Sequence, residues 1–334
     1  MQIYPLKLCA VLKDAIWGGN KLSGKYGFGS PGKNISEAWT LALGNDGISI
    51  IENGEAAGMS LFEYAGIVGM DKLCGEKYAG KNPFEFPLLV KLIDARDALS
   101  IQVHPDNEYA LSHSMTSGKS EMWYVIDAEP GAEIVLGLSA GTDINSPEFK
   151  TALYNDNGNI TKYLNYTKTK KGDIWYIPAG MVHSIGKGVL VAEVQQNCNI
   201  TYRIYDYGRN GIDGNPRELH FNKAMEVIKT DFSTDHSIGG GLLPDITGMP
   251  VKVIESKYFS VSKLILSGES FNFGNMPMTH ILCLDGEGRL EYTDKNGNKI
   301  ALDISASESI LVPESFGGFT LCSYTEAEFL LSSI

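Results

Sequence analysis

Short stretches in which apolar and polar residues alternate recur along most of the chain, and this period of two is typical of half-buried β-strands. Such stretches predict strands over residues 36–43, 99–105, 121–126, 134–138 and 193–205, and several more after residue 251. Apolar spacing typical of helices is confined to four shorter segments, at 60–78, 107–111, 146–153 and 220–228. We therefore predict a mainly β protein with a few short helices that cover its sheets.

The strand predicted over residues 99–105 carries its polar residues on one side. Because successive side chains of a strand point to opposite faces, Ser100, Gln102 and His104 share one face, opposite an apolar layer. The next predicted strand begins at Glu121. An imidazole, an amide and a carboxylate are thus expected on neighbouring strands, where they line a cavity.

A second polar row is predicted over residues 193–205, where polar residues occupy the odd positions and most even positions are apolar. Glu193, Thr201 and Arg203 would then share one face. A solvated face is normally richer in Lys and Glu than in Asn and Gln, so we favour a strand or bulged strand pair whose polar face lines the cavity. The alternative role of Arg203 is a structural ion pair with Glu193 or Asp206.

Turn residues divide the chain into two predicted domains. The run Gly239-Gly240-Gly241 favours a boundary there, which gives a larger domain over residues 1–240 and a smaller one over residues 241–334. Residues 307–318 echo residues 172–183, and Gly318 stands where the earlier segment has His183. We therefore expect the second domain to be a structural β unit that binds no metal.

Composition and charge narrow the class of protein. The 334 residues, 43% hydrophobic and 20% charged, are typical of a folded globular chain. With no basic-apolar leader and no run of about 18 apolar residues, we expect a soluble cytoplasmic protein that binds no membrane. Five widely spaced cysteines predict reduced thiols. The formal charge of −12 disfavours nucleic acid as a partner but permits a small anionic ligand. We expect a monomer or a weak homo-oligomer.

The segment from Gly172 to His183 has a glycine, five residues, then Pro178, Gly180 and finally the histidine. This spacing resembles the second signature of the cupin superfamily, in which a Pro-x-Gly turn delivers a metal-binding histidine into a jelly-roll barrel. Lys187 stands where that signature usually closes with asparagine. The resemblance implies two cupin-type jelly-roll barrels, the second of them degenerate.

A closer resemblance is carried by residues 86–95, 99–107, 118–121 and 201–203. These blocks are similar to type I mannose-6-phosphate isomerase, also called phosphomannose isomerase, in its short bacterial form. The resemblance implies an enzyme that acts on a small-molecule sugar phosphate and holds one Zn²⁺ per chain. It also implies the residues that serve the site: Gln102, His104, Glu121 and His183 for the metal, Ser100 and Lys119 for the substrate, and Arg203 for an active-site role.

The chemistry of these side chains agrees with that assignment. Two imidazoles, a carboxylate and an amide oxygen suit Zn²⁺, although other divalent ions fit the same set. Interconversion of mannose 6-phosphate and fructose 6-phosphate moves a proton between C1 and C2 through an enediol. Lys119 and Arg203 can supply positive charge either to the enediolate or to the phosphate. The proton carrier stays open between a neutral lysine, an acid such as Glu193 and a metal-bound water.

Other functions remain to be weighed at this point. A non-catalytic sugar-binding cupin would keep the pocket but lose the metal set, and every candidate ligand is present here. A metal-dependent cupin oxygenase would normally use two or three histidines, which Gln102 argues against. An isomerase of an unphosphorylated sugar is poorly separated from our prediction, because the phosphate-binding group is inferred mainly by resemblance.

Overall fold

In a computed structural model of the chain, the described residues are 1–155, 158–232 and 246–334. They fall into two compact units, one formed by Met1–Val11, Ala38–Lys91 and Leu243–Ile334, the other by Leu12–Glu37 and Leu92–Leu242. These units differ from the predicted domains in the first ninety residues. The reason is that β1 (Leu6–Cys9) pairs with β22 (Ser309–Val312), which places the N-terminal strand in a sheet of C-terminal strands. The boundary predicted near residue 240 lies outside the described residues.

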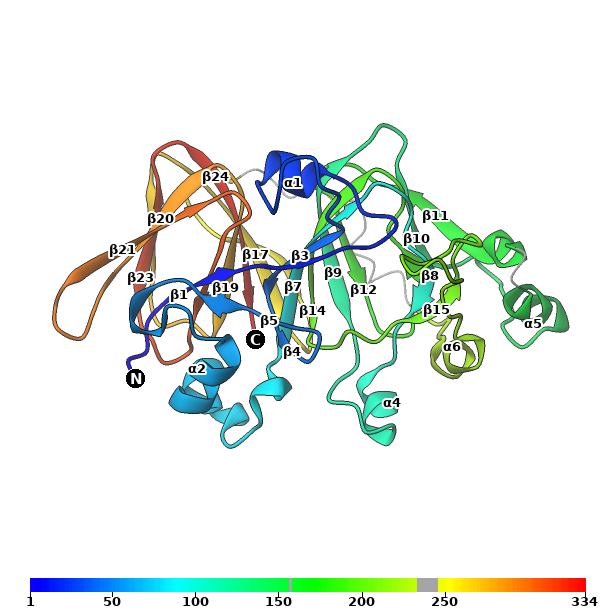
Figure 1. The fold of residues 1–334 in the computed structure, drawn as a ribbon, viewed down its shortest axis with the longest axis horizontal. Helices are drawn as coiled ribbons and strands as arrows, with labels where there is room; N and C mark the ends of the chain where they lie inside the picture. The colour runs from blue at the N-terminus through cyan, green and yellow to red at the C-terminus, as the bar shows by residue number, and fades with distance from the viewer. Residues whose placement is uncertain (156–157, 233–245) are drawn as a thin grey trace. The chain divides into compact units, whose positions relative to one another are not determined.

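Two sheets carry the residues of the candidate site (Figure 1). The five-stranded sheet has the order β11-β10-β13-β8-β15. Its strands are β11 (Leu164–Lys168), β10 (Glu133–Leu138), β13 (His183–Ser184), β8 (Ile101–Val103) and β15 (Tyr202–Tyr205). The six-stranded sheet has the order β12-β9-β14-β7-β3-β2. Its strands are β12 (Ile174–Ile177), β9 (Glu121–Ala128), β14 (Val189–Gln196), β7 (Leu88–Ala95), β3 (Glu37–Leu41) and β2 (Val11–Lys13).

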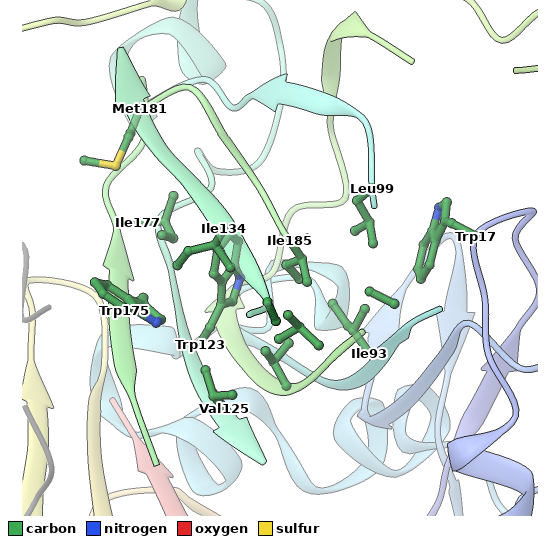
Figure 2. Packing of buried hydrophobic residues seen from close by; sticks show 14 residues of the cluster. Trp17, Ile93, Leu99, Trp123, Val125, Ile134, Trp175, Ile177, Met181 and Ile185 are labelled. Carbon is green, nitrogen blue, oxygen red and sulfur yellow. The ribbon is translucent and has the colours of Figure 1, made fainter. Parts of the chain in front are cut away.

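Apolar side chains fill the space between these sheets. Figure 2 shows this cluster, in which Trp123 and Val125 of β9 pack with Trp175 of β12 and with Ile134 of β10. Leu99 also lies in this cluster. It precedes β8, which begins at Ile101, so its side chain does not follow the alternation of that strand. A dry, aromatic-rich core of this kind holds the polar side chains that enter it in fixed positions.

Three short helices belong to the same unit: α4 (Asn107–Ser112), α5 (Pro147–Tyr154) and α6 (Phe221–Val227). Asp106 caps α4 by accepting a hydrogen bond from the Tyr109 N–H, and Ser146 caps α5 in the same way. Side chains of α5 and α6 form an apolar cluster with Ile101 and Val103. The predicted apolar layer of Leu99, Ile101 and Val103 is therefore confirmed for Ile101 and Val103, whereas Leu99 lies in the other cluster.

The long polar row predicted over residues 193–205 is not one face of a strand. β14 ends at Gln196 in the six-stranded sheet, and β15 begins at Tyr202 in the five-stranded sheet. Because the chain changes sheet between them, Arg203 does not share a face with Glu193, and the prediction that it does is wrong. The alternation of apolar and polar residues indicates which positions share a strand face, but it does not show where the chain passes from one sheet to another.

The other unit contains a seven-stranded sheet, β16-β17-β24-β19-β22-β1-β6, and a four-stranded sheet, β18-β23-β20-β21. The strands not yet given are β6 (Ile50–Ile51), β16 (Val251–Glu255), β17 (Ser260–Ser267), β18 (Ser270–Phe273), β19 (Thr279–Asp285), β20 (Glu287–Thr293), β21 (Lys299–Ser305), β23 (Phe319–Ser323) and β24 (Glu326–Ser333). The short strands β4 (Leu43–Gly44) and β5 (Gly47–Ile48) pair with each other. The prediction of a second small β-sandwich after residue 251 agrees with this arrangement.

The helical region predicted over residues 60–78 is present as α2 (Leu61–Val68), α3 (Met70–Cys74) and a 3₁₀ turn at Glu76–Tyr78. Ser60 caps α2 in a capping box with Glu63. A further short helix, α1 (Lys21–Lys25), has no counterpart among the predictions. Within the described residues, no helix is long and apolar enough to cross a membrane.

Candidate metal centre and substrate site

Two turns deliver the histidines of the candidate site. Pro105 follows His104 directly and ends β8, as expected from its missing N–H. Gly180, in the turn before β13, adopts a φ of +94° and donates its N–H to the His104 carbonyl at 2.9 Å. A Cβ at this glycine would lie 2.8 Å from Cγ of Lys229, so the turn requires glycine for space as well as for its backbone angle.

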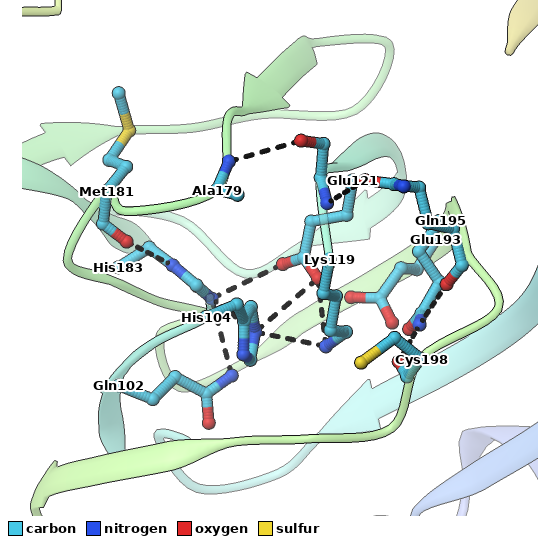
Figure 3. Close-up of polar contacts among 12 residues, drawn as sticks. Gln102, His104, Lys119, Glu121, Ala179, Met181, His183, Glu193, Gln195 and Cys198 are labelled. Atoms are coloured by element: carbon cyan, nitrogen blue, oxygen red, sulfur yellow. Dashed lines mark hydrogen bonds and ion pairs between the residues drawn. The ribbon is translucent and has the colours of Figure 1, made fainter. Parts of the chain in front are cut away.

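The structure brings three predicted ligands together. One nitrogen or oxygen atom from each of His104, Glu121 and His183 lies within 4.8 Å of the others, and all three side chains are buried. The two Nε2 atoms are 3.1 Å apart, and Nε2 of His183 lies 3.3 Å from Oε1 of Glu121. Figure 3 shows these side chains converging: Glu121 comes from β9, His183 from β13, and His104 from the turn that follows β8. The geometry is that of a small cluster able to surround a single cation.

The protonation state of His183 suits a metal ligand. Its Nδ1–H donates to the Met181 carbonyl at 2.8 Å, which leaves the Nε2 lone pair facing His104 and Glu121. Burial, with the nearby Lys119 charge as a further cause, lowers the pKa of His183 to about 4. The imidazole is therefore neutral at pH 7, the form that binds metal ions.

Gln102 lies at the edge of this cluster. It is paired with His183 across β8 and β13, and its Nε2 is 3.4 Å from Nε2 of His183. The Ser100 hydroxyl donates to the Gln102 Oε1 at 3.2 Å. Rotation of the amide by half a turn would bring its oxygen to the cluster and its NH₂ group to the Ser100 oxygen, which can accept.

Lys119 is buried beside the three candidate ligands. Its Nζ lies 2.9 Å from Oε2 of Glu121 and 3.0 Å from Nε2 of His104. Burial by itself would lower the pKa of Lys119, but the Glu121 and Glu193 carboxylates outweigh it and raise this pKa above its ordinary value. The ammonium group therefore places a positive charge against the cluster.

Glu193 is held by a tryptophan that sequence reasoning missed. Trp123 Nε1–H donates to Oε2 of Glu193 at 2.9 Å, and the two residues are paired across β9 and β14. The Trp123 ring also meets the His183 ring edge-to-face, with centroids 5.6 Å apart. Trp123 thus contacts both a candidate ligand and a candidate catalytic carboxylate. An indole in an apolar run gives no sequence signal for this role.

A chain of hydrogen bonds fixes the loop that carries Lys119, and its members were also missed. The Ser120 N–H donates to Oε1 of Gln196 at 3.0 Å, and the amide of Gln196 donates to Oδ1 of Asn107 at 3.0 Å. Asn107 Oδ1 also accepts from the Gly118 N–H at 2.7 Å. The density of amides between 195 and 199 was the available signal, but their partners lie 76 and 89 positions away in the chain.

Arg203 reaches the site through the other sheet. It is paired with Gln102 across β15 and β8, and Gln102 in turn with His183, so the three side chains form one row on one face of the sheet. The Arg203 Nη1–H donates to the Glu218 carbonyl at 2.7 Å. Asp206, one of the two ion-pair partners that the sequence suggested for Arg203, is paired with Arg209 and Arg217.

The donor set can hold a divalent cation. At neutral pH the cluster offers two imidazole nitrogens and a carboxylate, all buried at 1% exposure or less. A buried carboxylate needs a compensating positive charge, and lone pairs that face one another repel unless a cation or a proton lies between them. The mixed nitrogen and oxygen set is one that Zn²⁺ accepts. These residues therefore fit a bound metal ion.

Comparison with known proteins points in one direction. Residues 5–138 match the family model described as phosphomannose isomerase type I, catalytic domain. The chain is 36% identical over 332 residues to mannose-6-phosphate isomerase ManA of Bacillus subtilis, covering 98% of each sequence. It is 33% identical over 307 residues to mannose-6-phosphate isomerase of Streptococcus mutans, covering 89% of this chain and 92% of that protein.

Solved structures agree in fold. The crystal structure of mannose 6-phosphate isomerase from Bacillus subtilis superimposes with a TM-score of 0.83 at 30% identity, covering 99% of each chain. A zinc-bound mannose 6-phosphate isomerase matches with a TM-score of 0.74 at 16% identity, covering 99% of this chain and 100% of the other. The predicted fold class, mainly β with two cupin-type barrels, is confirmed.

Proposed function

Because the chain belongs to the type I phosphomannose isomerase family, we propose that it interconverts mannose 6-phosphate and fructose 6-phosphate. The observation that carries this proposal is the buried cluster of His104, Glu121 and His183, in a chain that aligns with an isomerase over nearly its whole length. The small-molecule partner is therefore a sugar phosphate. The contacts around these three residues support a role for each remaining candidate residue.

The metal is Zn²⁺, one ion per chain. His104, Glu121 and His183 hold it, and Gln102 is a weaker ligand because a neutral amide oxygen is a poor donor beside a carboxylate. When bound, the ion stabilises negative charge that develops on the sugar oxygens at C1 and C2. Met181 fixes the orientation of one ligand through its carbonyl, which accepts from Nδ1 of His183.

Three residues of the chain complete the catalytic site. Lys119, paired with Glu121, and Arg203, in the row with Gln102, provide fixed positive charge for an enediolate. Glu193 accepts a hydrogen bond from Trp123 and lies close enough to Lys119 to interact with its charge. We assign transfer of the proton between C2 and C1 to the Glu193 carboxylate, because the neighbouring carboxylates keep Lys119 in its charged form. The buried hydroxyl of Ser100 orients the substrate beside Gln102.

The catalytic role belongs to the unit that contains residues 92–242, and the strands after 251 act through packing. The cytoplasm is the expected compartment, because none of the cysteines in the described residues forms a disulfide. A monomer or a weak homo-oligomer suffices, since every candidate residue comes from one chain. No nucleic acid or membrane is required by this chemistry.

A coupled assay of the purified protein on mannose 6-phosphate and on free mannose tests the proposal. We expect activity on the phosphorylated sugar, its loss after chelation, and its recovery on addition of Zn²⁺. Activity on free mannose alone would refute the phosphate assignment. The absence of activity on both sugars in zinc-loaded protein would favour a non-catalytic sugar-binding protein.

A further inference from the structure

Three arginines lie near one buried carboxylate that follows β15, the strand of Arg203. Asp206, which follows β15 and is 3% exposed, accepts from Nη2 of Arg209 at 2.6 Å and from Nη1 of Arg217 at 3.1 Å. Arg203 is close enough that the charge of Arg217 contributes to lowering its pKa, after burial as the main cause. Three guanidinium groups and one carboxylate leave two positive charges, in a chain whose formal charge is −12.

The three arginines differ in what their hydrogen-bond donors already do. Arg209 is committed: its Nε donates to the Asp206 carbonyl, its Nη1 to the Ala98 carbonyl at 2.7 Å, and its Nη2 to the carboxylate. Arg217 uses only Nη1, so its Nε and Nη2 donate to none of the described residues. Nε of Arg203 is buried and likewise has no partner within residues 1–155, 158–232 and 246–334.

The loop that carries Arg217 is well anchored. Asn210 and Pro216 form a β-bridge, and the Gly211 N–H donates to the Asn215 carbonyl at 2.7 Å. Asp213 closes the turn by accepting from the Asn215 N–H at 3.1 Å. Together with the pair to Asp206, these contacts hold the guanidinium of Arg217 in place before any ligand binds, which lowers the entropy cost of binding.

Strand register fixes the spacing between Arg203 and the candidate ligand His183. His183, Gln102 and Arg203 lie on three successive strands, so Arg203 is two strand spacings, about 10 Å, from His183. Beyond Arg203, β15 runs to Asp206 and its arginines, while β8 runs back toward Ser100. A six-carbon chain with C1 and C2 at the candidate ligands would direct its terminal phosphate along β15 toward Asp206 and its arginines.

We propose that Arg217, oriented by Asp206, binds the phosphate group of the substrate and gives the enzyme its preference for phosphorylated sugars. A guanidinium presents paired N–H donors that match two phosphate oxygens, and its charge is permanent. Asp206 lies behind the arginines as their positioning residue. This inference rests on the proposed function, because it concerns the substrate of the same site.

The variant Arg217→Gln tests this inference. A charge-assisted hydrogen bond to phosphate is worth about tenfold to a hundredfold in binding. We expect KM for mannose 6-phosphate to rise by about that factor while kcat and zinc content stay near wild type. Inorganic phosphate should inhibit the wild type competitively, and its inhibition constant should rise in parallel. Arg217→Lys, which keeps the charge but not the fork, should fall between the two.

Arg96→Gln is the matched control, since Arg96 is a half-exposed arginine of the same unit that pairs with Asp97. It removes the same charge and should change neither KM nor the inhibition constant. An unchanged KM in Arg217→Gln, or inhibition by phosphate that is not competitive, would overturn the inference. A decrease in kcat without a change in KM would also overturn the inference.

Titration calorimetry with inorganic phosphate separates this inference from the proposed function. If the zinc-loaded wild type does not isomerise mannose 6-phosphate but binds phosphate more tightly than Arg217→Gln does, the site stands and the function fails. If the wild type isomerises and both proteins bind phosphate equally, the function stands and the site fails. Should Arg217→Gln melt well below the wild type, the same comparison is made with Arg217→Lys.

Discussion

The indole N–H of Trp123 donates a hydrogen bond to Oε2 of Glu193 at 2.9 Å, and both side chains are almost fully buried. The hydrogen bond joins neighbouring strands of the six-stranded sheet, and the ring of Trp123 packs against His183. A carboxylate buried in an apolar core is stabilised strongly by each hydrogen-bond donor that reaches it. Trp123 therefore positions Glu193 beside the candidate metal ligands.

Replacing Trp123 by phenylalanine keeps an aromatic ring against His183 but removes the donor. We expect the unfolding free energy to fall by about 1–3 kcal/mol, because Glu193 loses a buried hydrogen bond, and kcat to fall because the carboxylate is no longer held. Thermal unfolding and steady-state kinetics measure the two effects. Trp175→Phe is the control: it removes an indole N–H that donates to the neutral Thr169 hydroxyl, so it should lower stability without lowering kcat.

His183→Ala should remove metal and activity together. The side chain contributes a neutral nitrogen to the cluster, and no other described histidine can replace it there. Elemental analysis of the purified variant should find far less than one zinc per chain. His113→Ala, at an exposed position on α4, is expected to keep full zinc and full activity. Full metal occupancy in His183→Ala would count against its assignment as a ligand.

Arg203→Lys should reduce turnover while stability and zinc content stay near wild type. The arginine presents a planar fork in the row with Gln102, and a lysine cannot reproduce that fork. Loss of one preorganised charge from a site that stabilises an oxyanion costs about 10²–10³ in turnover. The only hydrogen bond that its guanidinium donates within the described residues is to the Glu218 carbonyl. A large drop in melting temperature with turnover preserved would instead establish a structural role for Arg203.

Acid should destabilise the protein partly through His280, which lies in β19 and is fully buried. Burial lowers the pKa of His280 to about 3. As the pH falls from about 6.5 toward 3, the unfolded chain takes up a proton that the folded chain does not, so stability falls, by at most about 1.4 kcal/mol per pH unit. Above pH 6.5 the histidine is neutral in both the folded and the unfolded state, so it contributes no pH dependence to the unfolding free energy.

Denaturant unfolding at several pH values measures this effect. His280→Gln, a neutral side chain of similar size, should show a shallower loss of stability below pH 6.5 than the wild type. His113→Gln, at an exposed site, should leave the slope unchanged. The same acid slope in His280→Gln as in the wild type would show that other groups control the acid response, His183 among them.

The sequence by itself determined most of the local structure and the choice of candidate ligands. The period-two pattern around Gln102, the capping residues Asp106 and Ser146, and the Pro-x-Gly turn before His183 are all local signals, and each is present as expected. They act over a few neighbouring residues, so the order of residues is enough to reveal them.

Only the tertiary structure decided which of these elements meet. The first strand joins a C-terminal sheet, since Leu6 pairs with Leu311, and the polar row after Glu193 divides between two sheets. Trp123 and Arg217 acquire their proposed roles from partners far along the chain or across a loop. Hydrogen bonds and charge pairs depend on distance in space, and strand pairing sets that distance independently of separation in sequence.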